Sequence, residues 1–254
     1  MQLNYKTFGQ GPPLIILHGL FGMLDNWQTI AKQLSDTFMV FIVDQRNHGR
    51  SPHLDHIDYP SMANDLKVFM EDNWIHEAHL LGHSMGGKTV MQFAMEYPEM
   101  IDKLVVVDIA PKAYQGGHQL IFDALHSIDL RAVQSRTEAD QKLALLVPDY
   151  GVRQFLLKNL SRDKENGGFR WKMNLSVITR DYPNIIAGLD TVGEFEGETL
   201  FIRGGRSDYI TTADESEIKL TFPQSEIQTV GDAGHWVHAE QPVALLQMLR
   251  QFLD

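Results

Sequence analysis

Residues 80–87 read L-L-G-H-S-M-G-G, and this stretch restricts the fold more than any other part of the sequence. A single serine, Ser84, stands among three glycines directly after an apolar run. A serine that stands clear of a sheet edge needs a very sharp turn from strand to helix, which strains its backbone. Side chains two residues before and two residues after the serine would collide there, so glycine is favoured at positions 82 and 86. The pattern therefore predicts a strand, an exposed serine hydroxyl and a helix, in that order.

Short apolar runs recur along the rest of the chain. Each is apolar almost throughout instead of alternating with polar residues, which is typical of parallel strands covered on both faces. Between the runs, apolar residues follow the i, i+3, i+4, i+7 spacing of helices, for example from Trp27 to Leu34 and from Val90 to Tyr97. Strands that alternate with helices predict an α/β fold with a mainly parallel sheet. The predicted strands are residues 14–17, 39–43, 79–81, 104–107, 200–202 and 227–230, and a last helix is predicted from Pro242 onward.

The alternation breaks once, between residues 111 and 190, where the pattern becomes helical. Within this segment, D-K-E-N-G-G at residues 163–168 is typical of a turn, and residues 178–186 are expected to form a short helix. A chain of 254 residues is long enough for one large core with an inserted subdomain. We therefore expect residues 1–110 and 191–254 to form the core and residues 111–190 to form a helical cap.

A serine hydroxyl is a poor nucleophile until a base takes its proton, and the base needs an acid that orients it. Near the end of the chain, D-A-G-H-W-V-H-A-E-Q-P follows the predicted strand at residues 227–230. Its first histidine, His235, comes after Gly234 on a loop from which an imidazole can reach back over Ser84. The second histidine, His238, is expected to lie near the last helix instead. The order serine, aspartate, histidine on a parallel-sheet pattern favours His235 as the general base.

Several other classes of protein are disfavoured. The stretch G-H-S-M-G-G does not match G-x-G-x-x-G, and Lys88 and Thr89 only superficially resemble the end of a phosphate-binding loop. The formal net charge of −11 argues against nucleic acid as a partner, since a phosphate backbone would be repelled. The absence of cysteine excludes disulfides, thiolate metal sites and cysteine nucleophiles. With no signal-peptide pattern and no apolar run of membrane length, we expect a cytoplasmic protein without a membrane span.

Five motifs spread over nearly the whole chain can be compared as a set. They are H-G-L-F-G at residues 18–22, D-Q-R-N-H-G-R-S at 44–51, G-H-S-M-G-G at 82–87, V-V-V-D-I-A-P at 105–111 and A-G-H-W-V-H-A-E at 233–240. Together they resemble the α/β-hydrolase superfamily, in particular bacterial YbfF-type esterases and abhydrolase-domain-11 proteins. The resemblance implies the α/β-hydrolase fold, a mainly parallel eight-stranded sheet flanked by helices, with an inserted helical cap. It also implies structural roles for Asp44, Arg46 and His48.

The resemblance further indicates which groups would stabilise negative charge on an attacked carbonyl, a task that requires two backbone N–H donors. One would be the N–H of Met85, directly after Ser84 at the amino end of the helix. The other would come from the loop that follows His18, where Leu20 is expected first and Phe21 second.

Two aspartates at predicted strand ends are candidates for the acid that orients His235. Asp208, in R-G-G-R-S-D-Y-I, follows the strand at residues 200–202, where most α/β-hydrolases keep their acid. Asp108 ends the strand at residues 104–107, one strand earlier in the sequence. YbfF-like members are similar in keeping that aspartate, so the resemblance slightly favours Asp108, and the sequence leaves both open.

The expected chemistry is hydrolysis of a small-molecule ester or thioester through an acyl-enzyme on Ser84, without a metal or an organic cofactor. A lyase, a carbon–carbon hydrolase and a cofactor-free haloperoxidase are alternatives on the same residues, and a small-molecule receptor is an alternative on the same fold. The cap carries six basic residues against two acidic ones at residues 153–172. This stretch is either a solvated face or an entrance that tolerates an anionic substrate such as an acyl-CoA.

Overall fold

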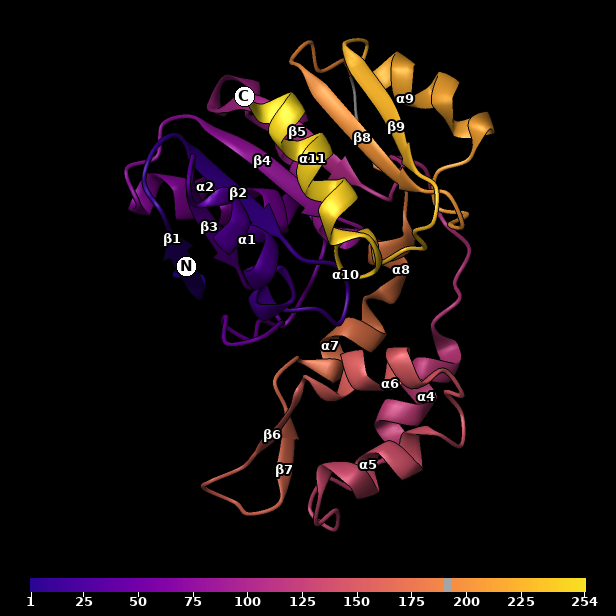
Figure 1. Ribbon diagram of the computed structural model, residues 1–254. Helices are drawn as coiled ribbons and strands as arrows, with labels where there is room; N and C mark the ends of the chain where they lie inside the picture. Colours follow the sequence, from indigo (N-terminus) through magenta and orange to yellow (C-terminus); the bar gives the residue numbers. More distant parts are fainter. Residues whose placement is uncertain (190–192) are drawn as a thin grey trace.

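A computed structural model of the protein describes residues 1–189 and 193–254. Its strands in the main sheet are β1 (Tyr5–Phe8), β2 (Pro13–Leu17), β3 (Met39–Val43), β4 (Ala78–His83), β5 (Ile101–Val107), β8 (Thr199–Gly204) and β9 (Ser225–Val230). Their order across the sheet is β1-β3-β2-β4-β5-β8-β9, as the upper half of Figure 1 shows. Among these strands, β1 is antiparallel to β3 and the remaining pairs are parallel. The expected α/β fold with a mainly parallel sheet is confirmed.

The described residues form seven strands in this sheet, so the expectation of eight is wrong for them. All six predicted apolar runs lie in strands, and the seventh strand, β1, lacked their signal because its residues Y-K-T-F are partly exposed at the sheet edge. Directly before β1, Asn4 bonds to the loop that follows β3. The Asn4 N–H donates to Ser51 Oγ at 2.8 Å, and the Asn4 side chain donates to Asp44 at 2.7 Å.

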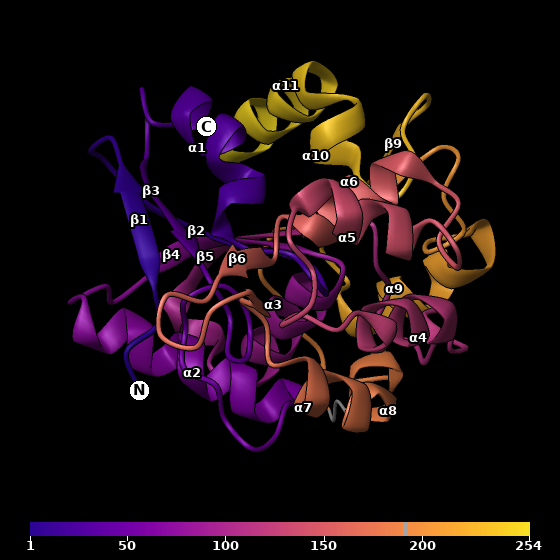
Figure 2. The same ribbon diagram turned by 90° about the horizontal axis from the view of Figure 1, so that it is seen from below.

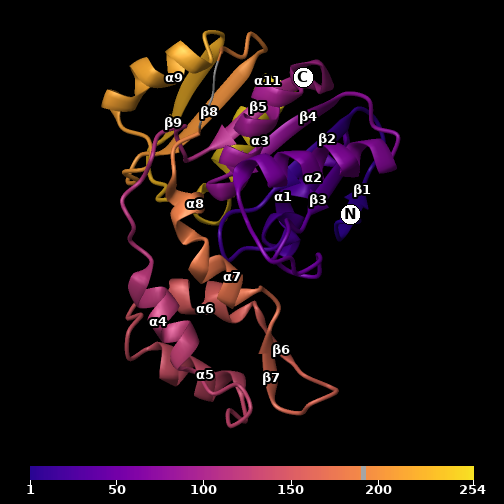
Figure 3. The same cartoon turned by 180° about the vertical axis from the view of Figure 1, so that it is seen from behind.

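Helices cover both faces of the sheet, which explains why its central strands are apolar throughout. In β5, for example, Val105 and Val107 pack on one side and Val106 packs on the other. On the first side lie α1 (Gln28–Leu34) and α11 (Pro242–Leu253). On the second side, seen from behind in Figure 3, lie α2 (Tyr59–Asp72), α3 (Met85–Glu96) and α9 (Glu215–Thr221). Shorter helices are η1 (Leu24–Trp27), η2 (Pro98–Met100), η3 (Thr212–Asp214) and α10 (Val237–Glu240).

An insertion of helices and one hairpin separates β5 from β8 in the chain and lies below the sheet in Figure 1. Figure 2, seen from below, shows these elements in front of the strands. The elements are α4 (Gln119–Ser127), α5 (Arg136–Leu143), α6 (Tyr150–Leu157), β6 (Leu160–Arg162), β7 (Phe169–Trp171), α7 (Leu175–Arg180) and α8 (Tyr182–Ile186). In the described part of the chain, no helix is long and apolar enough to cross a membrane.

Two details of the insertion differ from the sequence expectations. The turn predicted at residues 163–168 joins the antiparallel strands β6 and β7, which are too short and too exposed for a clear strand pattern. The helix expected at residues 178–186 is divided into α7 and α8 at Asp181, because Pro183 has no N–H with which to continue the first helix. The predicted boundary between cap and core, at residues 190 and 191, lies outside the described residues.

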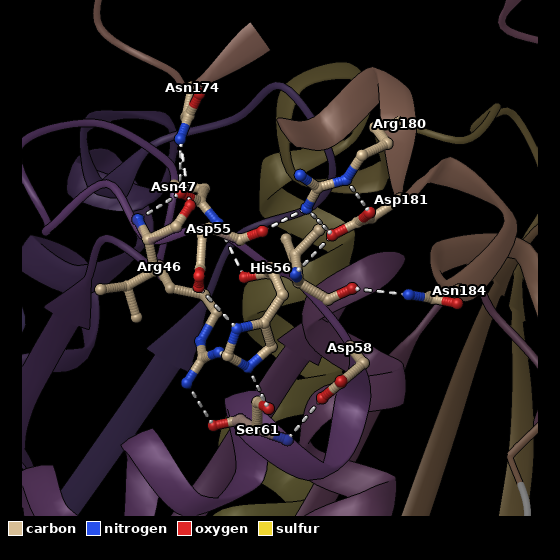
Figure 4. A network of polar contacts seen from close by, with 12 residues as sticks. Arg46, Asn47, Asp55, His56, Asp58, Ser61, Asn174, Arg180, Asp181 and Asn184 are labelled. Carbon is tan, nitrogen blue, oxygen red and sulfur yellow. Dashed lines mark hydrogen bonds and ion pairs between the residues drawn. The ribbon is translucent and has the colours of Figure 1, made fainter. Parts of the chain in front are cut away.

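Polar contacts hold α7 and α8 against the loop that precedes α2, as Figure 4 shows. The side-chain amide of Asn174 donates to the Leu54 carbonyl at 3.1 Å. The Asp181 carboxylate accepts from the Ile57 N–H at 3.1 Å, and the Asn184 amide donates to the Ile57 carbonyl at 3.2 Å. These bonds join backbone groups of the loop, so the carboxyl-terminal part of the insertion is fixed to the core.

The Arg46 side chain also contacts the loop that precedes α2. Its guanidinium forms a buried ion pair with Asp65 of α2, with 2.5 Å between Nε and Oδ2. It also donates to Nε2 of His56 at 3.0 Å and to the Ser61 carbonyl at 3.1 Å. Arg46 thereby connects the end of β3, the loop and the first turn of α2.

Candidate active site

The turn between β4 and α3 holds Ser84 in a backbone conformation that few residues adopt, with φ 53° and ψ −119°. The Ser84 N–H donates to the carbonyl of Val107 in the neighbouring strand at 3.0 Å. A Cβ atom at Gly82 would lie 2.1 Å from the Gly86 carbonyl oxygen. One at Gly86 would lie 2.6 Å from the Leu17 carbonyl oxygen, so β2 closes this second position. Backbone contacts therefore require glycine at both places.

Three side chains from three strand ends form one hydrogen-bonded row. Oγ of Ser84 lies 3.0 Å from Nε2 of His235, and Nδ1 of the same imidazole lies 2.8 Å from Oδ2 of Asp108. Because a carboxylate only accepts, the Nδ1 atom carries the imidazole proton and Nε2 faces the serine hydroxyl as an acceptor. The row therefore has the geometry in which an imidazole can take the serine proton while an acid orients it.

Asp108 is fully buried directly after β5, and it accepts hydrogen bonds from more than the histidine. Its Oδ1 accepts from the Gly204 N–H at 2.9 Å, and its Oδ2 also accepts from the Ser207 hydroxyl. Such donors stabilise an ionised carboxylate in a place that water does not reach. In the sequence, R-G-G-R-S-D-Y-I offers its aspartate as the candidate, so the contacts of Gly204 and Ser207 with Asp108 were not predicted.

Asp208, the other candidate acid, lies one residue beyond Ser207 but is exposed. It lines the cavity described below, and within the part of the chain that the structure describes it forms no hydrogen bond to His235. Of the two candidate acids, the structure brings only Asp108 to the imidazole. His238 lies in α10, where its ring stacks on Trp27 with 4.5 Å between ring centres.

Two aromatic rings fix the plane of the His235 imidazole. Tyr209 stacks on it with 3.9 Å between ring centres and 19° between ring planes. His83 lies at 4.8 Å and donates from Nε2 to the His235 carbonyl at 2.8 Å. Burial lowers the pKa of His83 well below its ordinary value, so this neighbour is neutral and does not repel a protonated His235. In the sequence, Tyr209 directly follows Asp208 and His83 directly precedes Ser84. This proximity to predicted site residues is the one sequence signal for Tyr209 and His83.

The loop that follows β2 lies directly against the serine. A Cβ atom at Gly19 would lie 3.1 Å from the Cβ of Ser84. The Gly19 carbonyl accepts from Nδ1 of His18 at 2.8 Å and from the Gly22 N–H at 2.9 Å. In a trans peptide the N–H points opposite to the carbonyl, so the Leu20 N–H is directed away from these two donors. The peptide that carries Leu20 is thus held in one orientation.

The other two expected N–H donors have different surroundings. Met85 is the first residue of α3, where helix geometry leaves the N–H without a partner inside the helix. Phe21 has a φ of 59°, and its carbonyl accepts at 2.7 Å from the side chain of Asn159. Asn159 is a fully buried residue of the insertion. The insertion therefore contacts the loop beside the serine through this amide, and also through Phe122, whose ring lies edge-on to the Phe21 ring with 5.3 Å between ring centres.

A cavity of about 480 Å³ opens beside Ser84, with walls from both the core and the insertion. Its volume falls within the ordinary range of small-molecule sites. Among the described residues, no lysine or arginine lines it, and most of the wall is apolar or aromatic. Lining residues include Phe21, Ile121, Val152, Phe155, Ile186 and Trp236. The arrangement suits an uncharged acyl group.

Residues 153–172 contribute Phe155 to the wall of this cavity, but none of their six basic residues lines it. Arg153 pairs with Asp140, with 2.8 Å between Nε and Oδ1. Lys172 donates to the Lys158 carbonyl at 2.9 Å, and Arg170 is exposed on the β6–β7 hairpin. These contacts favour the interpretation of a largely solvated face.

Comparisons with known proteins agree with this geometry. Residues 12–242 match the family model described as the alpha/beta hydrolase fold. The chain is 37% identical to the sn-1-specific diacylglycerol lipase ABHD11 of Danio rerio, over 100% of this chain and 83% of that protein. It is 38% identical to esterase YbfF of Escherichia coli strain K12, over 95% of this chain and 93% of that protein. Among solved structures, a marine microorganism esterase has a TM-score of 0.96 and 42% identity, over 99% of both chains.

Proposed function

The chain belongs to the alpha/beta-hydrolase family, and from this premise we propose that it is a serine esterase of uncharged carboxylic esters. The observation that carries the proposal is the row of Ser84, His235 and Asp108 at the mouth of an apolar cavity. The relatives named esterase and diacylglycerol lipase support ester hydrolysis as the reaction. The insertion serves as the cap of the cavity in this proposal.

The first half of the reaction acylates the serine. Oγ of Ser84 attacks the ester carbonyl while Nε2 of His235 takes the hydroxyl proton. The carbonyl π electrons move to oxygen, and the backbone N–H groups of Leu20 and Met85 stabilise the resulting oxyanion. When the tetrahedral intermediate collapses, the bond to the alcohol oxygen breaks and His235 gives its proton to the leaving alcohol. Asp108 keeps the imidazole in the required tautomer throughout.

The second half releases the acid and restores the enzyme. His235 takes a proton from water, whose oxygen attacks the acyl carbonyl, and the same two N–H groups stabilise the second oxyanion. Collapse of this intermediate returns the proton to Ser84 and frees a carboxylic acid. Every proton and electron pair is thus accounted for by the ester, one water and this chain.

The cavity narrows the substrate class. A dicarboxylate lyase would need several arginines at its pocket, and the cavity wall in the described residues has none. An acyl-CoA would place its charges against cations, and none of the six basic residues at 153–172 lines the cavity. A diacylglycerol, which one set of relatives is named for, is an uncharged ester of the favoured class. We propose uncharged acyl esters ahead of acyl-CoA thioesters on these grounds.

Ser84→Ala tests the nucleophile and separates an esterase from a receptor. Wild-type protein should release a burst of p-nitrophenol from a short acyl ester and then turn over steadily. The variant should lose on the order of 10⁴-fold in turnover, because catalytic residues that act as a unit fail together. Its thermal unfolding should be unchanged, since the hydroxyl contributes little to packing. Wild-type activity in the folded variant, or a phosphonate adduct at another residue, would refute the assignment.

A further inference from the structure

Lys88 is a buried lysine that the proposed chemistry does not use. It lies in α3, one helical turn after Ser84, and its side chain is only 1% exposed. Its ammonium group donates to the Lys112 carbonyl at 2.8 Å and to the Ala187 carbonyl. It also lies 4.9 Å from the centre of the Tyr114 ring, whose face attracts a cation. The charged end of Lys88 is therefore bound by protein groups.

The two carbonyls belong to the two segments that join the insertion to the core. Lys112 lies on the segment that leaves β5, and Ala187 lies on the segment that returns toward β8. We call residues 111–114 and 186–189 the stem of the insertion. One ammonium group thus binds both halves of the stem to the helix that begins directly after the proposed nucleophile.

The stem halves also bind each other and form part of the cavity wall. The Tyr114 N–H donates to the Ile186 carbonyl, and the Leu189 N–H donates to the Pro111 carbonyl, each at 2.8 Å. Tyr114 and Ile186 both line the cavity beside the serine. A shift of the stem would therefore move the wall against which an acyl group packs.

Stability alone does not explain a lysine at this position. In the described part of the chain it forms no ion pair with a carboxylate, and burial lowers the pKa of Lys88 to about 7. Replacing a buried charged group by an apolar one of similar size is often neutral or stabilising. What an apolar residue would not supply is the pair of hydrogen bonds to the stem carbonyls.

We propose that Lys88 is a positioning residue that fixes the stem, and with it the cavity wall at Tyr114 and Ile186, relative to Ser84. The inference rests on the proposed esterase function, because it concerns the cavity that receives the acyl group. Without its two hydrogen bonds the wall can shift while Ser84 and His235 stay in place. Lys88 therefore controls which acyl groups fit and does not affect bond cleavage.

Lys88→Met tests this inference, with kcat and KM measured for p-nitrophenyl acetate and p-nitrophenyl octanoate. For the octanoate, KM should rise about tenfold, the factor that corresponds to one or two net hydrogen bonds. The acetyl group ends beside the serine, so kcat and KM for the acetate should stay within about twofold of wild type. The split between the two esters is the result that a merely structural role would not produce.

Lys112→Met is the matched control, because it removes an ammonium group from the stem and keeps the carbonyl that Lys88 binds. That ammonium group pairs with Asp214 at 2.7 Å and lies 5.3 Å from the centre of the Tyr114 ring, so the control removes a charge near the same ring and leaves both hydrogen bonds of Lys88 in place. Both esters should react with it within about twofold of the wild-type rate. Lys88→Gln, which can still donate to one carbonyl, should fall between wild type and Lys88→Met, and it decides the question should the methionine variant not fold.

Hydrogen exchange supplies a readout that needs no activity. The Tyr114 and Leu189 amides, which join the stem halves, should exchange about tenfold faster in Lys88→Met than in wild type. Equal losses for both esters, or unchanged exchange at both amides, would overturn the inference. If wild-type protein does not hydrolyse the acetate at all, the proposed function fails, and the exchange measurement still decides the role of Lys88.

Discussion

Replacing Asp108 by asparagine keeps the shape of the site but turns one of its two acceptors into a donor. The carboxylate accepts from three groups, His235 Nδ1, the Gly204 N–H and the Ser207 hydroxyl. If the amide oxygen faces Gly204, the NH₂ group faces Nδ1 and forces the imidazole proton onto Nε2. If it faces His235 instead, the NH₂ group meets the Gly204 N–H, 2.9 Å away in the native contact. Neither orientation satisfies both contacts.

The expected loss of turnover follows from these two orientations of the asparagine amide. The orientation that satisfies Gly204 leaves Nε2 protonated and unable to accept the proton of Ser84, which in comparable triads lowers turnover about 10⁴-fold. That factor corresponds to about 5.4 kcal/mol in the activation free energy. The folded state also loses one charge-assisted hydrogen bond, so the free energy of unfolding should fall by about 2 kcal/mol. The loss of activity should therefore far exceed the loss of stability.

Asp208→Asn is the matched control, with the same change at the other candidate acid. Asp208 is exposed and makes no hydrogen bond to His235 in the described structure. An exposed carboxylate is screened by water, so its removal should change kcat by no more than about threefold. Both variants should be assayed with the same p-nitrophenyl ester near neutral pH, with urea unfolding measured on the same samples. A larger loss in Asp208→Asn than in Asp108→Asn would refute the reasoning.

Two further predictions concern pH and salt. Burial lowers the pKa of His18 to about 4 and that of His48 to about 3, so below pH 6.5 the unfolded chain binds protons that the folded chain refuses. The contribution of the two neutral histidines to the free energy of unfolding is therefore complete above pH 6.5 and is lost as the pH falls toward 4, with a slope of at most about 2.7 kcal/mol per pH unit. A free energy of unfolding in urea that does not change between pH 7 and 5 would contradict this prediction. Because the basic residues at 153–172 do not line the cavity, raising salt from about 0.02 to 0.3 M should change kcat/KM for an acyl-CoA and for the p-nitrophenyl ester of the same acid by similar factors. A loss confined to the acyl-CoA would restore the interpretation of the basic stretch as an anionic entrance.

The parts of the fold that could be predicted are those whose signal is local. Strands buried on both faces must be apolar throughout, so the five inner strands of the sheet were evident in the sequence. The elbow at Ser84 was equally evident, because backbone contacts within a few residues exclude a side chain at Gly82. Edge and hairpin strands such as β1 and β6 have partly exposed side chains, and their pairing depends on partners elsewhere in the chain.

Which of the two aspartates contacts His235 could not be predicted from the local sequence, for a different reason. β5 and β8 are neighbours in the sheet, so Asp108 and Asp208 both follow strands that end at the same edge. Nothing in the sequence near either aspartate states which one faces the imidazole. The difference comes from backbone geometry, since Asp108 has a φ of 53° and is buried against the Gly204 N–H, whereas Asp208 is exposed.

Lys88 is the clearest example of a residue whose surroundings could not be predicted from the sequence. In the sequence, Lys88 and Thr89 bear only a superficial likeness to a phosphate-binding loop, and nothing near them indicates a buried ammonium group. The structure gives both polar groups protein partners, since Thr89 donates to Gln45 and Lys88 binds carbonyls 24 and 99 residues further along the chain. Those partners become neighbours only when the insertion leaves β5 and returns to β8 beside α3. A residue whose surroundings form only when distant segments of the chain meet leaves no signal in the hydrophobic periodicity. Lys88 is such a residue, since its two hydrogen bonds join both ends of the insertion to α3.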